Sequence, residues 1–401
     1  MLNNNQHKIL ITIALAFSLF AEGSIYYLII FGASKEENKW LLTGISFATV
    51  LPSIFLAAPL GWAIDRFPIK RLWVGSLVVS ALLSFGMMLT ENYYILILLL
   101  AIQTICSILV GSVLFKGLPR IEGFTKDSAS SYIVGLSSVL AIVTPPASGL
   151  LFSTGRNLAF LTITALFVVS LIMVAMLVPP LNVRATAENL GLREIFFGLK
   201  SLKSISAIKY YLPVMFAVVL FTTMEDLSGI IYLQEISANY LRALDLQNID
   251  SGALGYSFII SMWPIGSLIA SIMIGKNYIN LRGLTSLVLG GFLVCLAVFF
   301  EGLIENVLLI ALFFIVGGAG NAIHNIGVRN IVYDTIPEGS QGRAWTFIGA
   351  SFTIFSALGK FLGTPYLLAE PKEVIFLSGL AGMTLIFISS ILIFFNKKTN
   401  T

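Results

Sequence analysis

Twelve long apolar runs constrain this chain of 401 residues more than any other feature. An α-helix rises about 1.5 Å per residue, so about 20 apolar residues cross the hydrocarbon core of a bilayer. Only helices and closed barrels satisfy their backbone hydrogen bonds there. The sequence therefore predicts an all-α membrane protein with twelve transmembrane helices. We expect these helices at Ile9–Phe31, Trp40–Leu60, Leu72–Thr90, Tyr93–Leu114, Ser131–Phe152, Leu158–Val178, Tyr211–Leu233, Ala253–Ile274, Leu284–Ile304, Val307–Gly327, Ala344–Leu368 and Val374–Phe395.

The composition agrees with a chain that is solvated mostly by lipid. Hydrophobic residues make up 57% of it and charged residues only 11%, whereas soluble domains carry about 25% charged residues. The net charge of +4 is scattered, with no run of Lys or Arg longer than a pair, which argues against nucleic-acid binding. Two histidines and two distant cysteines offer no metal-ligand cluster, and no phosphate-binding glycine loop is present. We expect neither an enzyme nor a bound cofactor or metal.

The distribution of Lys and Arg predicts the orientation of the helices, because cytoplasmic loops retain basic residues. With the N-terminus inside, eighteen of the 24 basic residues fall in cytoplasmic segments and five fall outside, while Lys360 lies within a predicted helix. Both termini are therefore expected to be cytoplasmic. The first apolar run is longer than the roughly 7 to 15 residues of a signal-peptide core, so we interpret it as a retained helix. The predicted location is the bacterial inner (plasma) membrane.

The longest internal hydrophilic segment divides the predicted helices into two halves of six. The expected organisation is an N-terminal half at 1–178, a cytoplasmic linker at 179–210 and a C-terminal half at 211–401. Part of the linker shows helical spacing of apolar residues, which predicts an interfacial amphipathic helix, with a plain linker as the alternative. The apolar positions are Leu192, Ile195, Phe196, Leu199 and Leu202.

A short internal repeat supports the two halves. Ala21–Leu28 in the first run resembles Glu225–Leu233 in the seventh, with an acid followed two residues later by a serine in each. Two parallel six-helix repeats with a binding site between them near the midplane are a known plan of transporters.

The connection between the second and third runs reads Gly-Trp-Ala-Ile-Asp-Arg-Phe-Pro-Ile-Lys-Arg-Leu from Gly61. It resembles the signature loop of the major facilitator superfamily, Gly-x-Leu-Ala-Asp-Arg-x-Gly-Arg-Lys, with a proline in place of the second glycine. The resemblance implies the major facilitator fold and a loop that latches one conformation. The partners considered for Asp65 are Lys116, Arg120 or the helix start at Ser340–Arg343; the alternative is a turn that only follows the basic-inside rule. The signature residues are Gly61, Asp65, Arg66, Lys70 and Arg71.

Two further segments are similar to elements of exporters in this superfamily. Thr144–Gly149 resembles a degenerate Gly-Pro-x-x-Gly-Gly element, in which Pro145, Pro146 and Gly149 kink the helix; a packing helix with no bearing on transport is the alternative. Ile336–Arg343 is similar to the branch that contains macrolide and enterobactin exporters. This resemblance implies proton-coupled export of a drug or siderophore. Uptake or facilitated transport of an anionic or lipid-like solute, and a membrane sensor without transport, stay open.

Polar residues inside the apolar runs are candidates for the site, because a charge within a membrane helix costs at least roughly 2.5 kcal/mol on insertion scales. Glu22 is our first choice for a protonation site, followed by Asp226 and Glu225; hydrogen bonding of Glu22 to Tyr26 or Gln103, or pairing with a lysine, is the structural alternative. His324 is interpreted as an interfacial side chain, with a proton relay and a pH sensor as the alternatives. The full set is Glu22, Tyr26, Gln103, Glu225, Asp226, Asn321, His324 and Lys360. The expected partners are a small-molecule substrate, protons and lipid, and we expect a monomer.

Overall fold

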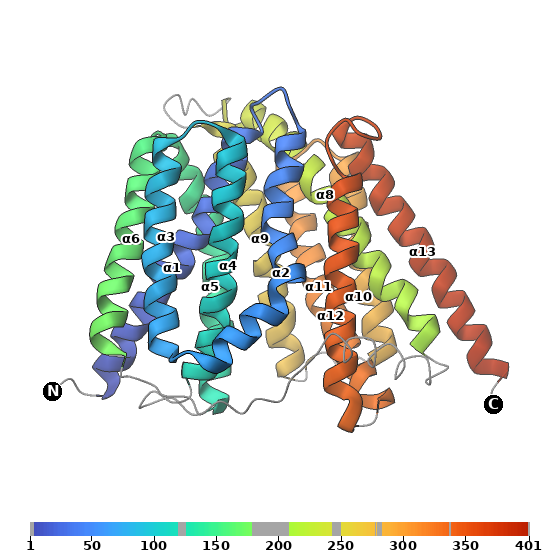
Figure 1. Ribbon diagram of the computed structural model, residues 1–401. Helices are drawn as coiled ribbons and strands as arrows, with labels where there is room; N and C mark the ends of the chain where they lie inside the picture. The colour runs from blue at the N-terminus through green and yellow to red at the C-terminus, as the bar shows by residue number, and fades with distance from the viewer. Residues whose placement is uncertain are drawn as a thin grey trace. The chain divides into compact units, whose positions relative to one another are not determined.

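The computed structural model describes residues 4–118, 126–178, 208–242, 250–276, 278, 283–336 and 338–399. Over these residues the chain forms twelve α-helices and no strand (Figure 1), one for each predicted run. The amphipathic helix expected near Leu192–Leu202 lies outside the described residues. The helices are α1 (Asn4–Ala33), α2 (Trp40–Arg66), α3 (Ile69–Leu89), α4 (Tyr93–Gly117), α5 (Lys126–Ser153), α6 (Arg156–Leu177), α8 (Ile208–Arg242), α9 (Ser251–Gly275), α10 (Gly283–Leu303), α11 (Val307–Thr335), α12 (Glu338–Leu362) and α13 (Pro371–Thr399).

Ten of the helices are long and apolar enough, over the described residues, to cross a membrane. The described apolar stretches of α2 and α12 are shorter, Trp40–Leu56 and Ile348–Leu362. The full count of twelve spans, and the cytoplasmic position of both termini, stay predictions.

The end of α12 differs from its prediction. The run was expected to continue to Leu368, but the helix ends at Leu362. The next residues are Gly363 and Thr364, and the proline at 365 disfavours a helical conformation in the residue before it. Lys360 consequently lies in the last turn of α12, and its prediction as a residue well inside the helix is wrong.

Helices α1 to α6 pack into one compact unit, called unit 1 here. Within it α1 contacts α5 and α6, α3 contacts α4 and α6, and α2 contacts α4. Small hydroxyl side chains join these helices: Ser170 donates to the backbone oxygen of Ala14 at 2.8 Å, and Ser84 lies 2.8 Å from Thr164. Close packing and short polar contacts stabilise helices in lipid, where burial of apolar surface contributes little between them.

Helices α8 to α13 form a second compact unit, unit 2, with the same internal plan. Here α8 contacts α12 and α13, α10 contacts α11 and α13, and α9 contacts α11. Each contact repeats one of unit 1, six helices later in the chain. The boundaries 1–178, 179–210 and 211–401 stay a prediction.

Glycines bring the backbones of α9, α10 and α11 together. A Cβ atom on Gly318 would lie 1.9 Å from the backbone oxygen of Trp263, and one on Gly320 would lie 2.8 Å from that of Gly290. No side chain fits at either position. Gly317, Gly318 and Gly320 thus form a small-residue packing surface on α11.

Candidate functional site

The acid of α1 lies within unit 1 and is held by a serine. Ser107 of α4 donates a hydrogen bond to the Glu22 carboxyl group. Gln103, one turn earlier on α4, was one of the partners considered for Glu22, but its amide donates to the Ser80 hydroxyl of α3 at 3.0 Å. Gln103 is buried, and its side-chain oxygen has no hydrogen-bond partner among the described residues. Glu22 and Gln103 therefore belong to one polar layer that crosses α1, α3 and α4.

The turn that follows Glu22 is packed against α5. Ser148 donates to the Ser24 hydroxyl at 2.9 Å, and a Cβ on Gly23 would lie 3.0 Å from the Thr144 methyl group. Pro145 and Pro146 lie inside α5, which is one continuous helix. The predicted kink element, which they form with Gly149, is therefore part of the helix that contacts α1 beside Glu22. Tyr26 is partly buried and packs edge-to-face on its neighbour in the chain, with ring centroids 5.5 Å apart.

In unit 2 the candidate lysine is paired with an acid. The Lys360 ammonium lies 3.2 Å from an Asp226 carboxylate oxygen, and the two side chains are 12% and 41% exposed. Glycines flank the lysine on the helix surface: Cβ atoms on Gly359 and Gly363 would lie 2.4 Å from Leu220 O and 1.8 Å from Met224 O of α8. This close approach of α12 to α8, of the small-xxx-small kind, positions the ammonium beside Asp226.

Glu225 points in a different direction from Asp226, as expected for neighbours about 100° apart on a helix. Its carboxyl group lies within hydrogen-bonding reach of Glu301 on α10, and Glu301 is only 1% exposed. Sequence reasoning missed Glu301 although it lies inside the predicted run Leu284–Ile304. The sequence did contain a signal for it: Leu303 and Ile304 follow Glu301, so this acid lies within the apolar run and not after its end.

His324 lies inside the α10–α11 contact, and its interfacial interpretation is wrong. It is 2% exposed, and its Nδ1 lies 2.9 Å from the Leu287 backbone oxygen. A carbonyl only accepts, so Nδ1 carries the hydrogen. Gly291 on α10 leaves room for the ring, because a Cβ there would lie 3.2 Å from Nδ1, while Gly290 lets α10 approach the His324 backbone. On the same helix, the Asn325 amide donates to the Asn321 backbone oxygen at 2.9 Å and to its side-chain oxygen at 3.1 Å.

The signature segment forms the junction of α2 and α3. Helix α2 ends at Arg66 and α3 starts at Ile69, so Phe67 and Pro68 alone connect them. Arg66 and Arg71 are exposed at the two sides of this junction, and Lys70 is partly buried. The surroundings of Gly61 and the side chain of Asp65 lie outside the described part, and the latch stays a prediction.

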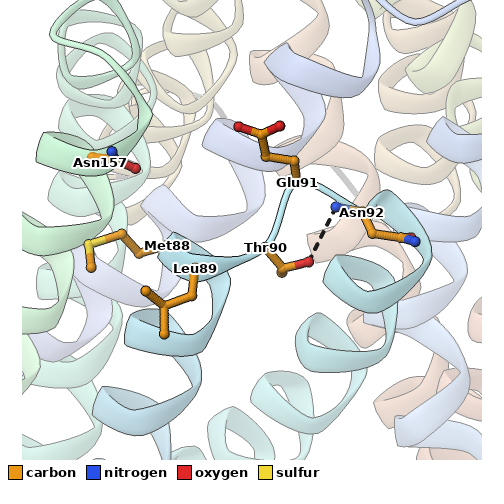
Figure 2. Close-up of a pocket in the computed structure, with 6 residues that line it drawn as sticks. All are labelled: Met88, Leu89, Thr90, Glu91, Asn92 and Asn157. Atoms are coloured by element: carbon orange, nitrogen blue, oxygen red, sulfur yellow. Dashed lines mark hydrogen bonds between the residues drawn. The ribbon is translucent and has the colours of Figure 1, made fainter.

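An open surface hollow of about 670 Å³ lies at the turn between α3 and α4. Figure 2 shows its lining, in which the Asn92 backbone N–H donates to the Thr90 hydroxyl at 3.2 Å. Asn92 also caps α4 through its side chain. Polar loop residues and helix ends form the hollow, and none of the predicted site residues lines it. We therefore place the candidate site at the charged groups inside the helices. The lining residues are Met88, Leu89, Thr90, Glu91, Asn92 and Asn157.

Two titratable groups in the connections between helices are perturbed by their surroundings. Burial lowers the pKa of Lys39, against the opposing charges of Glu36 and Glu37, while its ammonium donates to the Ser34 backbone oxygen at 2.7 Å. The hydrogen bond and charge of Lys372, 2.5 Å away, lower the pKa of Glu305.

The described residues form two repeats of six packed helices, and ten of these helices are long and apolar enough to cross a membrane. With few charged groups inside, they define a multi-pass membrane transporter fold. The chain belongs to the Major Facilitator Superfamily, whose family model matches residues 9–360.

Relatives and solved structures agree with this class. Two Mycobacterium tuberculosis proteins, from strains CDC 1551 / Oshkosh and ATCC 25618 / H37Rv and both named multidrug resistance protein B homolog, are 28% identical over 185 residues, 43% of this chain. The match spans about a third of the length of these curated relatives, 33%. The nucleoside transporter NupG superposes with a TM-score of 0.74 at 14% identity, covering 98% of this chain and 99% of its own. A POT family transporter in complex with 5-aminolevulinic acid gives 0.72 at 12% identity, covering 98% and 96%.

Proposed function

We propose that the protein exports a small amphipathic organic solute in exchange for protons, by alternating access, across the bacterial inner membrane with both termini in the cytoplasm. The observation that carries this proposal is the placement of Glu22. It lies in an apolar helix, and among the described residues its hydrogen bond comes from the Ser107 hydroxyl and not from a cation. A carboxyl group that no ion pair holds ionised is able to gain and lose a proton during a transport cycle.

The proposed direction and solute class rest on similarity. The curated relatives carry the name multidrug resistance protein, and Ile336–Arg343 resembles the exporter branch that includes siderophore carriers. An amphipathic drug or siderophore is therefore our proposed substrate. Uptake of an anionic solute is less well supported, because Lys360, the basic residue predicted within a membrane helix, is already paired with Asp226.

Proton flux into proteoliposomes tests this proposal. Purified protein is reconstituted with a pH-sensitive dye inside, a pH gradient is imposed, and drugs, siderophores and anionic lipids are added one at a time. We expect solute-dependent proton movement for the wild type and a fall to the level of empty liposomes for Glu22→Gln. Glu91→Gln, which changes an exposed acid between α3 and α4, is the matched control and should retain the flux.

The other outcomes separate the alternatives. Unchanged flux in Glu22→Gln would move the coupling group to the acids of α8. If no compound moves protons while labelled solute still crosses the membrane, proton coupling is wrong and facilitated transport remains. If no solute crosses at all, the sensor without transport is supported.

A further inference from the structure

Helices α8 and α10 each bring one acid to the same point inside unit 2. Glu301 is 1% exposed, and its carboxyl group is within hydrogen-bonding reach of Glu225. Both residues lie inside candidate membrane spans, Tyr211–Leu241 and Gly283–Leu303. Nothing in the sequence pattern paired them, since 76 positions of the numbering separate them.

A glycine makes room for this pair. The position that a Cβ on Gly229 would take lies 2.4 Å from Glu225 Oε1 and 3.2 Å from Glu301 Oε1. Two carboxyl oxygens thus fill the space beside the backbone of α8 that the side chain of any residue in place of Gly229 would occupy. Among the described residues, the buried Glu301 Oε1 has no hydrogen-bond partner. This acceptor atom lies near the same position beside Gly229 as Glu225 Oε1.

Simple chemistry restricts the charge of this pair. Ionised carboxylates only accept hydrogen bonds, so a hydrogen bond between two carboxyl groups needs a proton on one of them. Two like charges in contact and away from water repel each other strongly, which also disfavours double ionisation. A second proton would leave the pair neutral but is not needed for the contact. One proton for two carboxyl groups satisfies both requirements.

The charge of Lys360 on α12 also acts on Glu225, but the lysine's ion pair is with Asp226, at 3.2 Å. The Tyr232 hydroxyl on α8 donates to the Ile304 backbone oxygen. Around them, α9 contains no charged residue, His324 of α11 is bonded to Leu287, and Glu373 of α13 is exposed.

We propose that Glu225 and Glu301 form a binding site for a single shared proton, and that this site takes up and releases the proton in unit 2. The second part of this statement rests on the proposed function, while the first part does not. Glu301 is thereby assigned a role equal to that of Glu225, with Gly229 as the residue that leaves space for both. Asp226 and Lys360 form a separate, internally neutral pair beside the site.

Infrared spectroscopy of the full chain in liposomes tests the site without any transport assay. A protonated carboxyl group has its own carbonyl stretch, which an ionised one lacks. In the wild type we expect the intensity of this stretch to include a component from one protonated carboxyl group, and this component should require both Glu225 and Glu301. Glu225→Gln and Glu301→Gln should each remove the same component, and the double variant should remove no more than either. Glu373→Gln, an exposed acid of α13, is the matched control and should leave the spectrum unchanged.

Several results would overturn the proposal. Losses that add up in the double variant would mean that each glutamate holds its own proton. No loss in the double variant would mean that neither glutamate carries a proton in the wild type. A pH titration of the wild type gives a check that does not depend on whether a variant folds: raising the pH should remove the component in one step, and two separate steps would contradict sharing. If the wild type shows coupled transport but the glutamate variants have the spectrum of the wild type, only the shared-proton site is wrong. If the spectra change as expected but the wild type shows no coupled transport, only the proposed function is wrong.

Discussion

Units 1 and 2 share one packing plan but carry different charges at corresponding places. Ser24 on α1 and Ser228 on α8 are both fully buried. Ser24 accepts a hydrogen bond from Ser148 of α5, and Ser228 donates one to the backbone oxygen of Gly363, the residue that directly follows α12. Two residues before each serine is an acid. In unit 1 that acid, Glu22, is bonded to a serine, whereas in unit 2 Asp226 is bonded to a lysine.

This difference teaches that the repeat preserves helix contacts and not chemistry. The partner of Glu22 is a neutral hydroxyl group, so protonation of Glu22 leaves no unpaired buried charge behind. The α8 to α12 contact instead holds its acid with a cation and places a second acid, Glu225, against α10. We therefore expect the two units to respond differently to equivalent mutations, and the following predictions are ordered by expected size.

The largest effect is expected where α12 touches α8. A Cβ on Gly363 would lie 1.8 Å from the Met224 backbone oxygen, so Gly363→Ala must separate the helices and should cost about 3 kcal/mol or more of unfolding free energy. Urea unfolding in micelles measures it. Gly349→Ala on the same helix, where nothing lies within 4 Å, is the control and should be close to neutral. In unit 1, Gly23→Ala meets only a methyl group and should cost less; equal costs for Gly363→Ala and Gly23→Ala would contradict the comparison.

A medium effect is expected from breaking the ion pair of unit 2. Lys360→Met leaves the Asp226 carboxylate without its partner, and because Asp226 is 41% exposed we expect a loss of about 1 to 3 kcal/mol rather than the larger value of a fully buried pair. Adding Asp226→Asn should restore part of it in a double-mutant cycle. Independent, additive losses would show that the two groups do not stabilise each other.

The smallest effect is expected from the exposed pair of Glu305 and Lys372. Lys372 lowers the pKa of Glu305 in the folded protein, so the pair stabilises the fold above the unfolded value of about 4.3. That contribution disappears as the pH falls through the lower folded value. Comparing the pH dependence of the melting temperature for wild type and Glu305→Gln should show a slight difference at neutral pH that vanishes in acid. A difference that grows in acid would have the wrong sign.

Hydropathy predicted the helices well because lipid imposes length and apolarity on every spanning segment. It did not predict every helix end: α8 continues to Arg242, nine residues past the expected end at Leu233. It placed the end of α12 too late, since Gly363 and the following proline region are apolar but not helical.

The candidate site was predicted less completely, because the direction of a side chain and its partners depend on packing. Glu22, Asp226 and Lys360 were found as charges in apolar runs. The Glu225 to Glu301 contact required knowing that Gly229 faces α10, and the burial of His324 required knowing that Gly290 and Gly291 face this residue. A single sequence gives the spacing of glycines but not the helices that they bring together.

The backbone contacts among α9, α10 and α11 also have a mechanical consequence. Carbonyl oxygens of Trp263 and Gly290 lie directly against glycine positions of α11, so these three helices have no compressible side chains between them at those points. They are expected to move as one rigid body. Any change in the shape of unit 2 then has to occur as rotation of the remaining helices around this fixed block.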